Sequence, residues 1–338
     1  MSSFSLALDE NVLNNPYLMT KILLTGGAGF IGSHLAERLI QQGHRLFLVD
    51  DLNDFYSPEI KRQNLQEIRT KAPFEFVRAD ICDQPAILKV FEQHRPEVII
   101  HLAARAGVRP SLEQPYLYER VNVHGTLVLL DLARLCGVQK FVFASSSSVY
   151  GITSKAPFSE DESSPNPISP YGATKLAGEK LCYAYSHLYQ LPTICLRFFT
   201  VYGPRQRPDL AIHKFAILIE QGQEIPVFGD GSSFRDYTYI DDIVDGIAAT
   251  LELPTRFEIF NLGNSNPVSL TEMIRLLEKH LGKKARLQFK ESQPGDMPFT
   301  YADLGKAKQQ LGYDPRVPFE TGLSRFVAWF QNRPIHKT

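Results

Sequence analysis

The chain has 338 residues, of which 43% are hydrophobic and 22% are charged, and its formal net charge is −1. This length and composition predict a globular protein with one large core or two closely packed domains. Because the charge is nearly balanced, no global field draws the chain to nucleic acid or to an anionic membrane, and any anionic ligand has to be held by a few placed cations.

The cysteines and the first residues restrict the chemistry and the location. Cys82, Cys136, Cys182 and Cys195 lie far apart and form no CxxC pair, which predicts reduced thiols and no metal site. No apolar stretch approaches the ~20 residues that cross a bilayer. Residues 1–18 have neither a basic start nor a long apolar run. They indicate an N-terminal extension rather than a secretory signal, and we expect a cytoplasmic protein.

Short apolar runs alternate with helical patterns through the first two-thirds of the chain. This alternation, with runs that are apolar on both faces, predicts an α/β fold built on a parallel, doubly wound (Rossmann) sheet. Ligands of such a sheet bind at the carboxyl ends of its strands. The predicted strands are Lys21–Thr25, Arg45–Asp50, Phe74–Arg78, Val98–Leu102, Lys140–Ser145 and Thr193–Phe198, and the predicted helices include Ile31–Gln42, Gln84–His94, Pro115–Cys136 and Tyr171–Tyr189.

The pattern changes near residue 200, where prolines and glycines divide the chain into short elements. We expect Phe257–Asn261 to return to the main sheet as one more strand. Further helices are predicted at Leu270–Leu281, Asp303–Leu311 and Phe319–Phe330. The predicted organisation is a dinucleotide-binding domain over residues 19–199 plus about 240–262, and a smaller, discontinuous α/β domain for the substrate over residues 200–239 and 263–335.

A glycine-rich turn joins the first strand to the first helix. Gly26, Gly29 and Gly32 have the spacing GxxGxxG, and Phe30 and Ile31 open the helix. Glycine permits the tight turn and lets backbone N–H groups approach a pyrophosphate closely. The strand before and the helix after the turn are the context that a dinucleotide site requires.

Carboxylates follow the second and third strands. Asp50 ends the second strand about 20 residues after the glycines, where a carboxylate binds the adenosine ribose hydroxyls. A carboxylate there repels a 2′-phosphate, so NAD is favoured over NADP. Asp80 and Ile81 follow the third strand and are candidates to bracket the adenine. The alternative interpretation is a structural turn with aspartates that only cap helices.

Tyr171 and Lys175 share one face of a predicted helix at positions i and i+4. A free tyrosine has a pKa of ~10, so a phenolate near neutral pH needs a depression of roughly 3 units, or ~4 kcal/mol. A nearby ammonium and a positive nicotinamide ring can supply it. The run Ser145–Ser148 at the end of the fifth strand can donate to the substrate oxygen. Together these features predict oxidation or reduction at a carbon that bears a hydroxyl, although a Tyr/Lys pair alone also occurs by chance in helices.

Four motifs resemble the extended short-chain dehydrogenase/reductases, specifically the nucleotide-sugar epimerases. They are TGGAGFIGSH, a serine strand with SVYG, SPYGATK and RDYTYIDD, and the similarity runs from Lys21 to about Phe330. The resemblance implies a catalytic triad of Ser146, Tyr171 and Lys175. It also implies an NAD site to which Asp50, Asp80, Ala103 and Asn122 contribute.

Other stretches, DLNDFY and RFFTVYGPRQRPD, resemble the UDP-glucuronate 4-epimerases. Family members that eliminate water or CO₂ carry a carboxylic acid just before VYG, where this chain has Ser147 and Ser148; epimerisation needs no such acid. Thr200 stands where UDP-galactose 4-epimerases commonly have Asn. These small hydroxyls suit a carboxylate at C6 of the sugar. The cations expected to hold the diphosphate and the sugar acid are Arg109, Arg207, Lys214 and Arg235.

The predicted reaction is NAD-dependent inversion at C4 of a UDP-sugar through a 4-keto intermediate, with UDP-glucuronate and UDP-galacturonate as the specific pair. The alternatives are a UDP-glucose/UDP-galactose epimerase, a net dehydrogenase and a non-catalytic dinucleotide sensor. The resemblance further implies a homodimer that pairs the helices at residues 115–136 and 171–189. No nucleic acid or membrane partner is expected.

Overall fold

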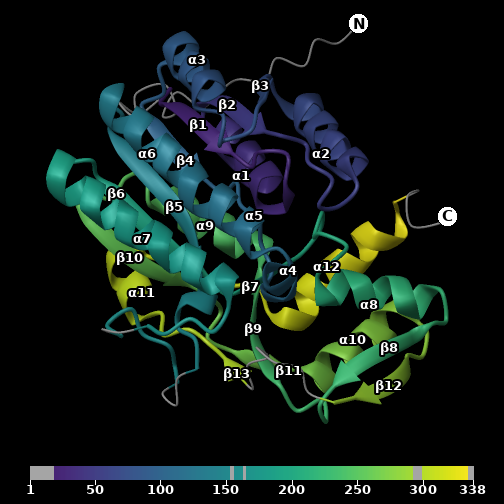
Figure 1. Ribbon diagram of the computed structural model, residues 1–338. Coiled ribbons are helices and arrows are strands. Elements are labelled where there is room, and N and C mark those ends of the chain that lie inside the picture. Colours follow the sequence, from purple (N-terminus) through teal and green to yellow (C-terminus); the bar gives the residue numbers. More distant parts are fainter. Residues whose placement is uncertain (1–18, 153–155, 163–164, 292–298, 334–338) are drawn as a thin grey trace, which may run out of the picture.

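The computed structural model describes residues 19–152, 156–162, 165–291 and 299–333 (Figure 1). Its main layer is a sheet of seven strands, which are β1 (Lys21–Thr25), β2 (Arg45–Asp50), β3 (Glu75–Arg78), β4 (Val98–His101), β5 (Lys140–Ser146), β6 (Thr193–Phe198) and β10 (Phe257–Leu262). They are all parallel, in the order β10-β6-β5-β4-β1-β2-β3. The predicted parallel, doubly wound sheet is confirmed, including the return of β10 beside β6.

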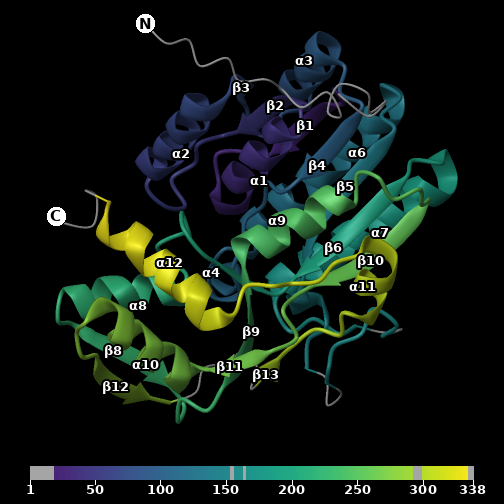
Figure 2. The same ribbon diagram turned by 180° about the vertical axis from the view of Figure 1, so that it is seen from behind.

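Helices cover both faces of this sheet because its strands are apolar on both sides. In β1, Ile22 and Leu24 belong to the core on one face, whereas Leu23 belongs to the core on the other. The first face is covered by α1 (Phe30–Gln41), α2 (Pro58–Lys71) and α9 (Ile240–Ala249), and the second by α3 (Gln84–His94), α6 (Gly125–Leu135) and α7 (Pro170–Tyr189) (Figures 1 and 2).

The structure divides residues 108–135 into several helical segments, whereas the sequence predicted a single helix over Pro115–Cys136. They form α4 (Val108–Glu113), α5 (Pro115–Glu119), a π-helical turn η1 (Arg120–His124) and then α6. The π turn contains Asn122, whose side chain bonds to the backbone of Arg105 and to Thr174. A wide turn of this kind re-aims one side chain within a continuous helix, and π turns are frequent at functional sites.

A smaller part of the chain lies beyond the carboxyl ends of the main sheet, at the lower right of Figure 1. One small sheet pairs β8 (Glu224–Phe228) with β12 (Arg286–Lys290) in parallel. A second contains β7 (Thr200–Tyr202), β9 (Phe234–Tyr239), β11 (Pro267–Ser269) and β13 (Phe299–Thr300). The helices of this part are α8 (Ala211–Glu220), α10 (Leu270–Leu281) and α12 (Phe319–Gln331), while α11 (Gly305–Leu311) packs near β10.

The smaller part shares the core of the first face of the main sheet. Ile212, Leu277 and Phe326 belong to the same buried cluster as Ile22 and Leu24. The predicted domain boundaries stay a prediction, and residues 1–18, the predicted extension, lie outside the described residues. None of the helices in the described ranges is long and apolar enough to cross a membrane.

Candidate active site

A cavity of about 470 Å³ lies at the carboxyl ends of the main strands and reaches toward the smaller part. Its lining combines the glycine-rich turn after β1, the end of β5 and the start of α7. Most of the residues predicted from sequence meet here: Gly26, Gly29, Phe30, Ile31, Gly32, Asp50, Asp80, Ile81, Ala103, Ser146, Ser147, Ser148, Tyr171, Lys175, Thr200 and Arg207.

The glycine-rich turn has the close approaches that glycine alone allows. Gly26 has φ +71°, and a Cβ there would lie 2.8 Å from the backbone N of Ala103. A Cβ on Gly32 would lie 2.1 Å from the carbonyl O of Gly26. Gly29 caps α1, and no side chain accepts from the first N–H groups of the helix. These donors and the positive end of the helix dipole suit a phosphate group.

Asp50 lies at the end of β2 beside the cavity and is 6% exposed. Its Oδ1 accepts from the backbone N of Leu52 at 2.9 Å and from Nζ of Lys61 at 3.3 Å. Burial raises the pKa of Asp50, and the charge of Lys61 opposes that rise. Lys61 also lies 3.8 Å from Asp51. Sequence reasoning assigned no role to Lys61, although it follows the DLNDFY stretch.

The predicted catalytic group is assembled from the end of β5 and the first turn of α7. Ser169 caps α7, since its side chain accepts from the backbone N of Gly172 at 3.1 Å, and this fixes the helix start that carries Tyr171. Ser146 Oγ accepts from the backbone N of Ser148 at 3.2 Å, where the strand passes into a short 3₁₀ turn, η2 (Ser147–Val149).

The protein by itself raises the pKa of Tyr171, so the predicted depression depends on added positive charge. Burial raises the pKa of the phenol, while a side-chain hydrogen bond with Ser146 and the charge of Arg207 lower it by less. Lys175 donates from Nζ to the carbonyl O of Ala144 at 2.7 Å. Burial lowers the pKa of Lys175 to about 8. The ammonium group of Lys175 therefore contacts the backbone at the end of β5.

Arg207 reaches the cavity from the loop after β7 and is held by two neighbours. Its Nε and Nη2 donate to the two carboxylate oxygens of Asp209 at 2.9 and 2.7 Å. The guanidinium lies 5.2 Å from the ring centroid of Phe55. Burial opposes the charge of Arg207, but Asp209 outweighs it, so the pKa of Arg207 lies above its ordinary value. Sequence reasoning assigned no role to Phe55 or Asp209, because nothing in their spacing shows this contact.

Four predicted residues lie outside the lining of the cavity. Arg109 stacks over Phe228 with its Cζ 4.4 Å from the ring centroid. Lys214 is an exposed residue of α8, and Arg235 donates from Nη1 to the carbonyl O of Phe234 at 2.9 Å. Asn122 is buried beneath the cavity, where it joins Thr174 to the segment after β4. Substrate contacts by Arg109, Lys214 and Arg235 stay predictions.

Sequence reasoning assigned no role to a buried histidine that lies below the cavity. His101, the last residue of β4, places Nδ1 2.8 Å from Thr25 Oγ1 and Nε2 3.0 Å from Thr126 Oγ1. Burial lowers the pKa of His101 to about 3, and the charge of Lys175 acts in the same direction. The imidazole is therefore neutral, and it connects β1 to α6. No group of three or more metal-ligating side chains occurs within the described ranges.

A parallel, doubly wound fold whose cavity joins a glycine-rich turn to a half-buried tyrosine and a buried lysine defines the class of short-chain dehydrogenase/reductases. The family model described as GDP-mannose 4,6 dehydratase matches residues 23–326. A UDP-glucuronate 4-epimerase of Thermodesulfobacterium geofontis is 45% identical over 308 residues, which cover 91% of this chain and 95% of that protein. The chain belongs to the extended short-chain dehydrogenase/reductase family, in its nucleotide-sugar epimerase branch.

Solved structures agree with this assignment. UDP-glucuronic acid 4-epimerase from Bacillus cereus, in complex with UDP-glucuronic acid and NAD, is 39% identical with a TM-score of 0.87, over 92% of this chain and 99% of that one. UDP-glucose 4-epimerase from Thermotoga maritima, with UDP-glucose, is 35% identical with a TM-score of 0.85, again over 92% and 99%. NAD, the predicted cofactor, is thus present in a homologous structure.

Proposed function

We propose that this protein is an NAD-dependent UDP-sugar 4-epimerase that interconverts UDP-glucuronate and UDP-galacturonate through a 4-keto intermediate. The observation that carries the proposal is the composition of one cavity. Tyr171 and Ser146 share it with the hydroxyls of Ser147, Ser148 and Thr200 and with the guanidinium of Arg207. The relatives that are UDP-glucuronate 4-epimerases support it.

The cofactor side of the cavity fits NAD. The turn that contains Gly26, Gly29 and Gly32 leads into α1, where no side chain caps the first N–H groups, so these groups suit the diphosphate. A side chain on Gly32 would close this cradle. Asp50 suits the ribose hydroxyls, with Asp80, Ile81 and Ala103 farther along the lining. When bound, NAD supplies the oxidant for C4 and a positive charge near the phenol.

The residues of this chain then handle the proton of the C4 hydroxyl. Tyr171 accepts it, and Ser146 hydrogen-bonds the same oxygen. Because burial raises the pKa of Tyr171 in the protein alone, the phenol gives up its own proton only where positive charge is added. Lys175, charged and buried at the foot of the site, contributes to that field. The flat 4-keto sugar turns about its link to the diphosphate, and Tyr171 returns the proton as the opposite C4 configuration forms.

The far end of the cavity decides which C6 group is accepted. Ser147, Ser148 and Thr200 are small hydroxyl donors, and the guanidinium of Arg207 lines the same cavity. A 4-keto glucuronate is a β-keto acid, which loses CO₂ when its C5–carboxylate bond stands perpendicular to the carbonyl plane. Donors that pin the carboxylate away from that geometry favour epimerisation. Arg109, Lys214 and Arg235 are proposed for the diphosphate end of the substrate.

A second candidate is interconversion of UDP-glucose and UDP-galactose. It is favoured by the similarity to the Thermotoga maritima enzyme with UDP-glucose and by the pairing of Arg207 with Asp209, which neutralises the cation. Small hydroxyls also accept a neutral CH₂OH group. The two candidates share the same catalytic residues and differ in the group at C6.

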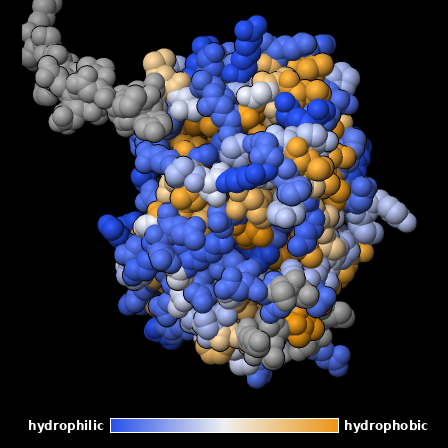
Figure 3. All heavy atoms as spheres, turned by 90° about the vertical axis from the view of Figure 1, so that its left-hand side faces the viewer, coloured by the Kyte–Doolittle hydropathy of each residue, from blue (hydrophilic) through white to orange (hydrophobic). Residues whose placement is uncertain are grey.

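We further propose that the protein is a cytoplasmic homodimer that pairs α6 and α7 with their copies. Leu135, Tyr183, Leu188 and Tyr189 are exposed on these two helices and at their ends. Figure 3 looks onto the side of the molecule where α6 and α7 lie and shows hydrophobic residues at its surface. Light scattering at several concentrations tests this, since a monomer at all of them would exclude the pairing.

The substrate proposal is tested by steady-state kinetics on matched substrates. The purified protein is assayed with UDP-glucuronate and with UDP-glucose under the same conditions, and the products are separated by ion-exchange chromatography. We expect kcat/KM for UDP-glucuronate to exceed that for UDP-glucose by at least about 10-fold, the ratio that one charge-assisted hydrogen bond supplies. Equal values, or a preference for UDP-glucose, would favour the second candidate.

A further inference from the structure

The loop between β7 and α8 points its side chains in two directions. Arg207 turns toward the cavity, whereas Arg205 turns away from it and is 6% exposed. Arg205 has φ +61°, a left-handed conformation that a non-glycine residue adopts only where its surroundings hold it. The carbonyl O of Pro204 is 2.9 Å from Nε2 of His34 in α1, and the carbonyl O of Gln206 accepts from His213 in α8.

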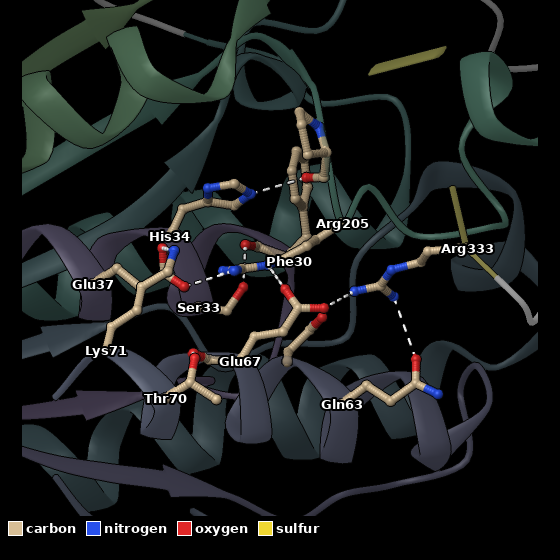
Figure 4. Close-up of polar contacts among 12 residues, drawn as sticks. Phe30, Ser33, His34, Glu37, Gln63, Glu67, Thr70, Lys71, Arg205 and Arg333 are labelled. Atoms are coloured by element: carbon tan, nitrogen blue, oxygen red, sulfur yellow. Dashed lines mark hydrogen bonds and ion pairs between the residues drawn. The ribbon is translucent and has the colours of Figure 1, made fainter. Parts of the chain in front are cut away.

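Arg205 is held by carboxylates from two helices of the main sheet (Figure 4). Its Nη2 donates to Oε1 of Glu37 in α1 at 2.6 Å, and its Nε donates to Oε2 of Glu67 in α2 at 2.8 Å. The side chain of Arg205 is 6% exposed and that of Glu67 is 40% exposed, and partly buried ion pairs of this kind are screened less than surface pairs. The guanidinium is planar and rigid, so two contacts from different helices fix both its place and its orientation.

Each of these carboxylates also has a second cation. Lys71 donates to the other oxygen of Glu37 at 2.6 Å, and Arg333, just after α12, donates to the other oxygen of Glu67 at 2.5 Å (Figure 4). Arg333 contacts the same glutamate as Arg205, and its other side-chain hydrogen bond goes to Gln63, also in α2. If Arg205 is removed, each carboxylate therefore still has one cation. If Arg333 is removed, the ion pairs of Arg205 with Glu37 and Glu67 remain.

The two helices are the ones that adjoin the cofactor side of the cavity. α1 begins at the glycine-rich turn, and α2 follows the loop that brings Phe55 over Arg207. The loop after β7 is thus fastened to the cofactor side two residues before Arg207. From these contacts we infer that Arg205 is a positioning residue that sets the place of the Arg207 guanidinium relative to the sugar, and hence the preference for an acidic C6 group. The inference rests on the proposed function, in which Arg207 binds the substrate carboxylate.

A merely structural role makes a different prediction from a positioning role. If Arg205 only stabilised the fold, its loss would lower turnover of acidic and neutral sugars alike and would add independently to the loss of Arg207. If it positions Arg207, its loss should affect UDP-glucuronate selectively. It should also cost little once Arg207 is absent, because effects of residues that act through one another are not additive.

The experiment measures kcat/KM for UDP-glucuronate and UDP-glucose in wild type, Arg205→Met, Arg207→Ala and the double variant, with Arg333→Met as the matched control. We expect Arg205→Met to lower the ratio of the two values about 10-fold, the worth of one well-placed charge-assisted contact. The double variant should match Arg207→Ala within about 2-fold. Arg333→Met should keep the wild-type ratio even where its melting temperature falls.

Three results would overturn the inference: an equal loss on both sugars in Arg205→Met, additive losses in the double variant, or the same change of ratio in Arg333→Met. Should Arg205→Met fail to fold, Arg205→Lys takes its place. A lysine at this position retains one ion pair but lacks the planar guanidinium that contacts both carboxylates. We therefore expect a ratio of the two kcat/KM values between those of the wild type and Arg205→Met. If the wild-type protein turns over neither sugar, both the proposed function and the inference are refuted. If the wild-type protein prefers UDP-glucuronate but Arg205→Met lowers kcat/KM equally for both sugars, the inference alone is refuted.

Discussion

The two ends of the cavity are built from different materials. At the cofactor end, the diphosphate part consists of backbone, namely the turn from Gly26 to Gly32 between β1 and α1, whose shape depends on the absence of side chains. The substrate end consists of side chains from several places: Ser146 at the end of β5, Thr200 in β7 and Arg207 in the following loop. The first end follows from a short stretch of sequence, and the second exists only once the chain has folded.

This difference predicts which property of the protein a substitution at each end should change. A change in the backbone-built end should disturb cofactor retention and stability together, since the same atoms close the turn and receive the ligand. A change in the side-chain-built end should leave the fold and the cofactor in place and alter turnover or selectivity. Tyr171 lies where the two ends meet.

The largest expected effect is that of Tyr171→Phe. Removal of the group that exchanges the C4 proton should lower kcat roughly 10³-fold, within the range of acid–base catalysis, while bound NAD and the melting temperature change little. Tyr118→Phe is the matched control, since Tyr118 packs edge-on against Tyr171 with ring centroids 6.2 Å apart and donates to the carbonyl O of Ala106. An active Tyr171→Phe variant would exclude the proposed acid–base role.

Gly32→Ala should break the cofactor end. The added Cβ would lie 2.1 Å from the carbonyl O of Gly26, so we expect a loss of about 2–3 kcal/mol in unfolding free energy and purification without nucleotide. Gly29→Ala is the control in the same turn, because its Cβ would approach the same oxygen only to 3.2 Å. Urea unfolding and the nucleotide content of the purified protein measure both effects. A Gly32→Ala protein with normal nucleotide content would contradict the backbone-built cradle.

Acid should destabilise the protein through His101. Its folded pKa of about 3 lies below its ordinary value of 6.5, so below pH 6.5 the unfolded chain binds a proton that the folded protein does not. Stability therefore falls as the pH drops from 6.5 toward 3, by about 2 kcal/mol at pH 5 for this residue. Urea unfolding at pH 7 and pH 5 measures the loss of unfolding free energy between the two pH values. We expect this loss to be smaller by about 2 kcal/mol in His101→Gln than in the wild type. Parallel losses in the two proteins would show that His101 titrates normally. His34, with a pKa lowered to about 4 by burial, acts in the same direction.

Arg207→Ala should have the smallest effect on rate and the clearest effect on products. We expect KM for UDP-glucuronate to rise about 10-fold with the loss of one charge-assisted contact, and the share of UDP-pentose from decarboxylation to increase. UDP-glucose turnover should change little. Chromatography of the UDP-sugars measures the ratio. Loss of activity with an unchanged product ratio would show that Arg207 does not restrain the carboxylate.

The contrast between the two ends also explains what could be predicted from the sequence. Local patterns placed β1, β2, β6, α3 and α10 to the residue, because apolar periodicity and turn residues are short-range features. They missed α2, whose sequence PEIKRQNLQEIRTK carries only a narrow apolar stripe of Ile60, Leu65 and Ile68. They also predicted one continuous helix where the structure has a π turn at Arg120–His124. This turn depends on the contacts of the Asn122 side chain, among them its hydrogen bond to Thr174.

Contacts between distant parts of the chain were beyond such patterns. Arg205 pairs with Glu37 across 168 positions and with Glu67 across 138, and no spacing rule connects them. The same holds for Phe55 over Arg207. The residues of the site could be selected by motif, but the ion pairs that orient them required the fold. The raised pKa of Tyr171 likewise follows from burial, which the sequence does not state.

The most direct test of oxidation and reduction at C4 is proton NMR of the product formed from UDP-glucuronate in D₂O. We expect UDP-galacturonate that retains protium at C4, because the same hydrogen leaves and returns to that carbon without exchange with solvent. Deuterium at C4 would indicate removal of a carbon-bound proton to solvent, and absence of the galacto configuration would refute epimerisation at C4.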